Sequence, residues 1–284
     1  MVKYMDWSKA KTILIIAFII VNIVVVYVVI SQKPTEDPTL TDEFVGNVKK
    51  LLSEKNISVE SDIPKIIPSL KSLIVEFEKA NLDDLNNRYF NGNGVMEYDE
   101  ELQETVMGDK SILVINERLI IYEDNGEDVL YENIDKDKAI EISQDFMKKG
   151  KFDTSDMKLT YFKEEQGVFY LEYSKVYDGV IIERAYTNFQ IDNRGVKRFE
   201  RLWLDPKELG EYDIYISTAP KSLLNLLGMQ EVYGKTITDI SLCYYFDPEK
   251  HEYSQGFGET KQGKAVPAWR IQFNDGYKVF IDEY

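Results

Sequence analysis

The two residue types most common in catalytic and metal sites occur once each in this chain, as Cys243 and His251. A single cysteine closes no disulfide within the chain, and a single histidine excludes the zinc sites that need several imidazoles. Cys243 lies in an alternating apolar segment without cationic neighbours, so we interpret it as a buried, inert thiol. His251 lies in a highly charged turn, and no G-x-S-x-G motif occurs elsewhere. We therefore predict no catalytic residue and no metal ligand at either position.

Other patterns resemble known sites but have the wrong spacing. The glycines of 256–263 match neither the dinucleotide nor the P-loop pattern. Asp135 with Asp137, and the turn at 192–195, resemble parts of a calcium loop but lack its downstream glutamate. The 50 acidic residues make close carboxylate pairs inevitable, so such pairs do not indicate a glycosidase. We expect no cofactor and no small-molecule substrate, and we predict that the protein is not an enzyme.

The composition is that of a folded, strongly acidic protein. The 284 residues are 44% hydrophobic and 13% aromatic, and the net charge is −16. A chain this hydrophobic can bury a core, which excludes intrinsic disorder. The negative charge repels phosphate, so we predict no nucleic-acid partner.

The N-terminal region contains an uncharged apolar stretch, Ile13–Ile30, of 18 residues. As a helix it spans about 27 Å, close to the thickness of the hydrocarbon core of a bilayer. It is longer than the apolar region of a signal peptide and lacks an A-x-A exit, so we predict an uncleaved signal anchor, with a transmembrane helix over 12–30. A cleaved leader peptide is the alternative.

The flanking charges predict the orientation of this helix. Residues 1–11 contain three lysines, Lys9 and Lys11 among them, against one acid, a net charge of +2 that leaves −18 for the rest of the chain. Because lysine and arginine stay on the cytoplasmic side, we place 1–11 inside the cell and 31–284 outside the membrane.

Four residues of the helix are candidates for contact with lipid or with a partner: Trp7, Phe18, Asn22 and Tyr27. Trp7 precedes the apolar stretch, where an amphipathic ring suits the headgroup region. Asn22 lies mid-span, where its amide has no polar lipid group to bond. Two readings stay open: the helix tolerates one asparagine, or Asn22 faces a partner helix.

The exported part is predicted to have the α+β class. A polar linker at 31–39 precedes a first domain at 40–134 and a second at 135–284. Apolar periodicity predicts helices over about 44–55, 82–89, 136–149 and 223–227, and alternation predicts strands between them. Tight turns are expected at 91–94, 124–126, 178–179, 192–195 and 275–276. Repeated units of one helix and an antiparallel β-meander follow, with the helices on one face of each sheet.

Two segments resemble the YycI family. The opening Met5–Ile13 (MDWSKAKTI), running directly into the apolar stretch, is similar to the start of that family, and Val266–Ile271 (VPAWRI) is similar to a strand near its end. The resemblance covers the full length, and the N-terminal motif is the more specific. The four residues before the motif depart from it, which leaves Met5 as an alternative start.

The resemblance implies a regulatory protein of a Gram-positive bacterium. In this family the protein pairs with YycH, and both contact an essential cell-wall sensor histidine kinase of the WalK/YycG type, largely through membrane helices. The sign of the effect differs between relatives. An anchored wall-binding or ligand-binding module is the runner-up, and an anchored hydrolase a more distant third.

Overall fold

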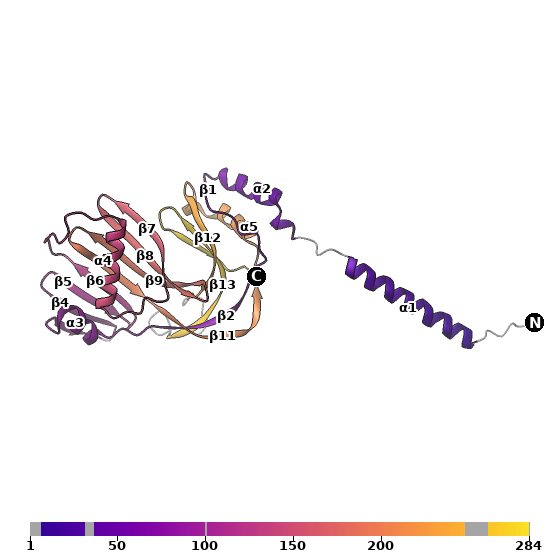
Figure 1. Cartoon of the computed structure of the whole chain (residues 1–284), viewed down its shortest axis with the longest axis horizontal. Coiled ribbons are helices and arrows are strands. Elements are labelled where there is room, and N and C mark those ends of the chain that lie inside the picture. Colours follow the sequence, from indigo (N-terminus) through magenta and orange to yellow (C-terminus); the bar gives the residue numbers. More distant parts are fainter. Residues whose placement is uncertain (1–6, 32–36, 100, 248–260, 284) are drawn as a thin grey trace, which may run out of the picture.

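A computed structural model describes residues 7–31, 37–99, 101–247 and 261–283, and the side chains of the first helix from Lys11 to Tyr27. The helices in these residues are α1 (Trp7–Ser31), α2 (Asp42–Ser53), α3 (Leu82–Phe90), α4 (Lys136–Lys149) and α5 (Ala219–Ser222), with 3₁₀ turns η1 (Pro38–Leu40), η2 (Leu223–Gly228) and η3 (Gln230–Val232). Figure 1 shows α1 apart from the body of the molecule.

The body is a mixed α+β structure dominated by one sheet. Its strands are β1 (Ser58–Val59), β2 (Ser69–Phe77), β3 (Val95–Tyr98), β4 (Leu102–Met107), β5 (Lys110–Ile115), β6 (Leu119–Asp124), β7 (Met157–Glu165), β8 (Val168–Tyr177), β9 (Val180–Asp192), β10 (Gly195–Leu202), β11 (Leu204–Tyr215), β12 (Thr236–Tyr245), β13 (Gln262–Phe273) and β14 (Lys278–Ile281). The α+β class predicted from the sequence is therefore confirmed.

The 14 strands form one hydrogen-bonded sheet rather than separate meanders. Its main path is β11-β2-β13-β12-β9-β10-β6-β5-β4-β3, with β1, β14, β7 and β8 attached to its sides. Three meanders, β3–β6, β7–β10 and β12–β14, follow the predicted antiparallel pattern. Parallel pairing of β12 with β9 and with β1 joins parts that the sequence pattern treated separately.

Local sequence signals explain where the helices begin. Asp135 accepts a hydrogen bond from the backbone N of Lys138 at 2.8 Å, and this cap starts α4 as predicted. Thr41 accepts one from the backbone N of Phe44 at 3.3 Å and starts α2. α2 and α4 each bury an apolar stripe against the sheet or a neighbouring helix.

The apolar side chains gather in separate cores. α3 and α4 cover one face of the β3–β10 part of the sheet, and aromatic residues such as Phe146, Phe189 and Phe199 meet there. A second core lies between α2, α5, η2 and the strands β12–β14. A third, around Trp203 and Phe246, lies between these two regions.

The first core contains residues from both sides of Ile134, the predicted domain boundary. A shared core does not by itself say whether 40–134 and 135–284 fold alone, so this division stays a prediction.

The turn predicted at 91–94 was expected to form a β-hairpin, and this expectation was wrong. Residues 91–94 do not form a hairpin: Asn91 and Gly92 take positive φ angles of 54° and 76° and end α3. Asn-Gly favours positive φ in both contexts, so the residue pair alone did not distinguish a helix end from a hairpin. The strand β7 and the full length of β11 were also missed. The predicted short helix near Leu223 is the 3₁₀ turn η2.

The side chains described in α1, from Lys11 to Tyr27, are all exposed. Among the residues that the structure describes, no helix is both long enough and apolar enough to cross a membrane. The structure gives no support to the span predicted at 12–30, which stays a prediction.

Candidate functional site

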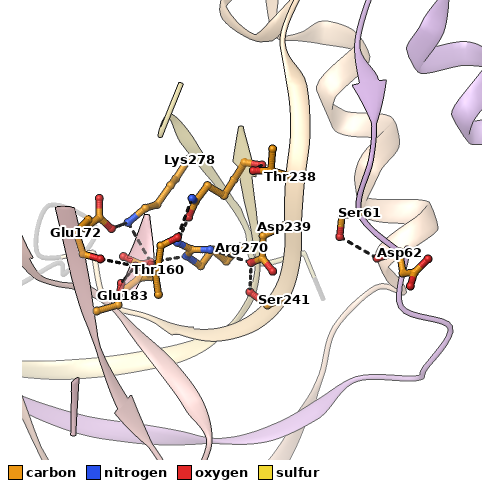
Figure 2. A network of polar contacts seen from close by, with 12 residues as sticks. Ser61, Asp62, Thr160, Glu172, Glu183, Thr238, Asp239, Ser241, Arg270 and Lys278 are labelled. Carbon is orange, nitrogen blue, oxygen red and sulfur yellow. Dashed lines mark hydrogen bonds and ion pairs between the residues drawn. The ribbon is translucent and has the colours of Figure 1, made fainter. Parts of the chain in front are cut away.

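A buried ion pair joins β9 and β13, the two strands on either side of β12 in the sheet. Arg270 donates from Nε to Glu183 Oε1 at 2.7 Å, and the two side chains are only 1% and 3% exposed. The same guanidinium donates from Nη1 to Asp239 Oδ2 at 2.9 Å and from Nη2 to Gln272 Oε1. Figure 2 shows the Arg270 side chain between Glu183 and Asp239. The fork of the guanidinium thus connects β9, β12 and β13.

Lys278 on β14 extends this network toward β8. Its ammonium group forms an ion pair with Glu172, and it also lies 3.4 Å from Glu183 Oε1. The side chains of Lys278 and Glu172 are 12% and 16% exposed. Figure 2 shows both cations directed toward the Glu172 and Glu183 side chains.

Neutral groups complete the network. Gln272 Nε2 donates to the Thr160 carbonyl at 3.0 Å, which links β13 to β7. The Thr160 hydroxyl lies 2.8 Å from the Ser174 hydroxyl, and Ser241 donates to Asp239 Oδ2 at 2.7 Å. Together these contacts link the strands β7–β9 to β12–β14.

The geometry of the network is better suited to holding the strands together than to catalysis. The two cations and three carboxylates are already bonded to each other, and removal of a partner would leave an uncompensated charge on a buried group such as Glu183. A general acid or base must be within hydrogen-bond reach of the substrate proton that it transfers. Among the described residues, no group of acidic, histidine or cysteine side chains is placed to hold a metal ion.

Cys243 lies beside this network and is fully buried, as predicted. Burial, and after it the nearby Glu183 carboxylate, raises the pKa of the thiol well above its usual range. The thiol therefore stays protonated, which makes it a poor nucleophile. His251 falls outside the described residues.

A second charged cluster surrounds Trp203. The Arg201 guanidinium lies 4.2 Å from the centre of the Trp203 ring and 4.8 Å from that of Phe152. It donates to Glu78 Oε2 at 2.8 Å and to the Thr187 hydroxyl at 3.0 Å. Lys175 approaches the same tryptophan and forms ion pairs with Asp156 at 2.5 Å and Asp205 at 2.9 Å. These cations, too, are held by contacts within the chain.

A cavity of about 490 Å³ opens between α3, α4 and β6. Its wall includes three aromatic rings: Phe146 stacks on Tyr89 with the centroids 4.7 Å apart, and it meets Tyr122 edge to face at 4.9 Å. Burial raises the pKa of both tyrosines, so their phenols stay neutral. Lys149 donates to the Tyr89 carbonyl at 3.2 Å at the rim. A pocket of this size and lining is suited to a small ligand.

The candidate residues predicted from the sequence are all on α1. Asn22 Nδ2 donates to the Phe18 carbonyl at 2.7 Å, one turn back along the helix. With 3.6 residues per turn, Phe18 and Asn22 share a face, and Tyr27 lies roughly opposite. Lys11, Phe18 and Tyr27 are exposed, while Trp7 and Lys9 precede the part of α1 whose side chains the structure describes. Their contacts with lipid or a partner stay predictions.

The sequence interpretation did not identify the Arg270 network. One signal was available: Glu183 and Arg270 directly follow apolar residues in strands that are mostly apolar at that point, VIIERA and AWRIQF. A charge at such a position is seldom fully buried unless it is paired. The sequence did not reveal which residues would be its partners.

No protein-family model and no curated protein matches the sequence. An uncharacterised protein from Eubacterium rectale ATCC 33656 is similar in structure, with 12% identity and a TM-score of 0.49, over 86% of this chain and 97% of that one. YycH from Bacillus subtilis matches with 14% identity and a TM-score of 0.49, over 75% of this chain and 53% of that one. The C-terminal domain of YpeB from Bacillus megaterium matches with 9% identity and a TM-score of 0.35, over 86% and 93%. Likenesses this distant carry no argument about function.

Proposed function

We propose that this chain is a non-enzymatic, membrane-anchored regulator of a cell-wall-sensing histidine kinase, acting together with a YycH-like partner. The observation that carries the proposal is in the sequence, where Ile13–Ile30 is an apolar stretch of 18 residues without a charge. An apolar helix exposed on all sides is stable in lipid or against other helices rather than in water. The resemblance of Met5–Ile13 to the YycI family supplies the class of partner.

The proposed location is a cell membrane crossed once, with the N-terminus in the cytoplasm. Lys9 and Lys11 precede the apolar stretch, and the remainder of the chain carries the negative charge. The proposed regulation passes through contacts within the membrane or between exported domains, and it requires a different affinity for the two states of the kinase.

Asn22 is the proposed point of contact between helices. Its bond to the Phe18 carbonyl uses one amide hydrogen and leaves a second hydrogen and Oδ1 for a neighbour. Hydrogen bonds between membrane helices contribute about 0.6–2 kcal/mol. Within the exported part, the mutual pairing of Arg270, Glu183 and Lys278 favours a structural over a catalytic role.

The runner-up function is that of an anchored wall-binding or ligand-binding module, which the cavity between α3 and α4 favours. An exchange of 12–30 for an unrelated apolar helix of equal length distinguishes the two functions. In the full chain, a regulator should lose co-purification with the kinase and the YycH-like protein. Retention of both partners after the exchange would contradict the proposal, and unchanged binding to purified cell wall would then favour the module.

A further inference from the structure

One face of the β3–β6 meander is apolar but has no helix packed on it. The core face of this meander contains Ile112, Val114 and Ile120 and lies under α3 and α4. The pairing register places the other face on the alternate residues, with Leu113 opposite Ile121, Ile115 opposite Leu119, and Val106 opposite Val95. Figure 1 shows this part of the sheet at the end of the body far from α1.

We call the outer face the β3–β6 patch and define it by six apolar residues: Val95, Leu102, Val106, Leu113, Ile115 and Ile121. The first three are 73%, 44% and 39% exposed, and the others are partly exposed. Among the described residues, none of the six belongs to or packs against the four apolar cores. The patch is continuous across four neighbouring strands.

The sequences of β5 and β6 are unusual for a sheet with one solvent-exposed face. An antiparallel sheet with one solvated face normally alternates apolar and polar residues, whereas a strand covered on both faces reads as a continuous apolar run. Residues 112–115 (ILVI) and 119–122 (LIIY) are continuous apolar runs. Four consecutive apolar residues in β5 and in β6 therefore indicate that these two strands are covered on both faces.

Charge on the same face indicates what covers it. Glu97 and Glu104 lie directly opposite each other on β3 and β4, and neither forms an ion pair with any described residue. Like charges in this arrangement destabilise a strand pair. By contrast, Glu123 and Glu200 at the other side of the face share Arg198. A cation brought by a partner would relieve the repulsion between Glu97 and Glu104.

We propose that the β3–β6 patch is the docking surface for the exported domain of a partner protein that presents apolar side chains beside a lysine or arginine. A second copy of this chain fits poorly, because symmetric docking would bring two Glu97–Glu104 pairs together in a molecule that already carries a charge of −16. The proposed function supplies the partner to test, the YycH-like protein. The surface itself is argued independently of α1.

Photocrosslinking with the full chain in cells tests the surface. A photoreactive amino acid is placed at position 106 on the patch, and a matched control at position 212, which is exposed on β11 at the other end of the sheet path. We expect adducts with the co-expressed YycH-like protein from position 106, at a yield about tenfold above that from position 212. The yield should fall to the control level in Leu113→Asp/Ile121→Asp, and markedly in Glu104→Lys.

Folding controls accompany the variants. If Leu113→Asp/Ile121→Asp lowers the Tm of the full chain, Glu104→Lys supplies the decisive comparison, because its side chain lies on the surface. Equal yields from positions 106 and 212, yields that the variants do not change, or adducts between two copies of this chain would each overturn the docking surface.

The test separates this inference from the proposed function. A crosslinker at position 18 of α1 reports on the contact in the membrane. Adducts from position 18 but not from 106 would leave the proposed function standing and overturn the patch. If position 106 forms adducts with a different protein, and Glu104→Lys abolishes these adducts, the patch is a docking surface but the YycH-like protein is not its partner.

Discussion

Arg270 and Glu183 are separated by 87 positions in the sequence, yet their side chains form a 2.7 Å ion pair that is almost completely buried. The pair joins β13 to β9 and, through Lys278, to β8. Each of its charges depends on the others, because an unpaired charge at this depth would be strongly unfavourable. The relative placement of the β7–β9 and β12–β14 strands is thus fixed by charge as well as by apolar packing.

Removal of one partner should therefore destabilise the protein strongly. We expect Arg270→Met to lower the free energy of unfolding by about 3–5 kcal/mol, because Glu183 and Asp239 lose their main cation. Urea unfolding of the full chain in detergent measures the change. Lys163→Met is the matched control, since Lys163 pairs with Glu165 at the surface, and its effect should stay below about 1 kcal/mol. Similar effects for both variants would contradict the account of the network.

Asp192 should contribute a pH-dependent part of the stability. Burial alone would raise the pKa of this carboxyl, but hydrogen bonds from the Arg194 side chain and backbone outweigh burial and lower the pKa below its usual value. The stabilisation is complete above the unfolded pKa of about 3.9 and is lost as the pH falls through the lower folded value. Wild type should exceed Asp192→Asn in Tm at pH 6, and the difference should shrink below about pH 4. A difference that grows on acidification would reverse this interpretation.

The cap of α4 is open to a direct test. Asp135→Ala should lower the free energy of unfolding by about 1 kcal/mol, because the backbone N of Lys138 loses its acceptor. Asp145→Ala removes an exposed acid from the same helix without removing a cap. Thermal unfolding of the two variants side by side should show a clearly lower Tm for Asp135→Ala only.

Glu97 and Glu104, which lie opposite each other beside the β3–β6 patch, predict a gain in stability for the free protein. Glu104→Gln should raise the free energy of unfolding by about 0.2–1 kcal/mol, because it removes the repulsion by Glu97 on the opposite strand. Glu211→Gln on β11 changes the net charge equally and is the control. Equal Tm values for the two variants would show that Glu104→Gln acts through the net charge and not through the repulsion between Glu97 and Glu104.

Asn22→Leu isolates the polar group within α1. We expect weaker co-purification with the kinase or the YycH-like protein, since one hydrogen bond between helices is lost, while the chain remains in the membrane fraction. Val21→Leu at the adjacent position is the control. Unchanged recovery of both partners in Asn22→Leu would show that the contact does not use this amide.

Local elements could be predicted from the sequence because their signals are local. Asp135 and the apolar residues after it predicted α4, and the Asp178-Gly179 and 192–195 turns separated β8, β9 and β10. Residues 91–94 misled because Asn-Gly fits a helix end as well as a hairpin.

The order of the strands could not be predicted, because it depends on contacts between distant segments. β2 pairs with β11 and β13, both from the last third of the chain, and β12 joins β9 in parallel. The Arg270–Glu183 network depends on that order. Two charges within apolar strands were visible in the sequence, but their pairing was determined only by the fold.

The central claim is that α1 lies in a membrane and contacts a regulated kinase or its YycH-like partner there. Photocrosslinking in cells from each position between 13 and 30 tests this claim most directly. We expect adducts with these proteins that recur with the 3.6-residue period of a helix and are strongest on the face of Phe18 and Asn22. An absence of adducts at every position, with an active chain recovered from the culture fluid and cleaved after residue 30, would contradict it.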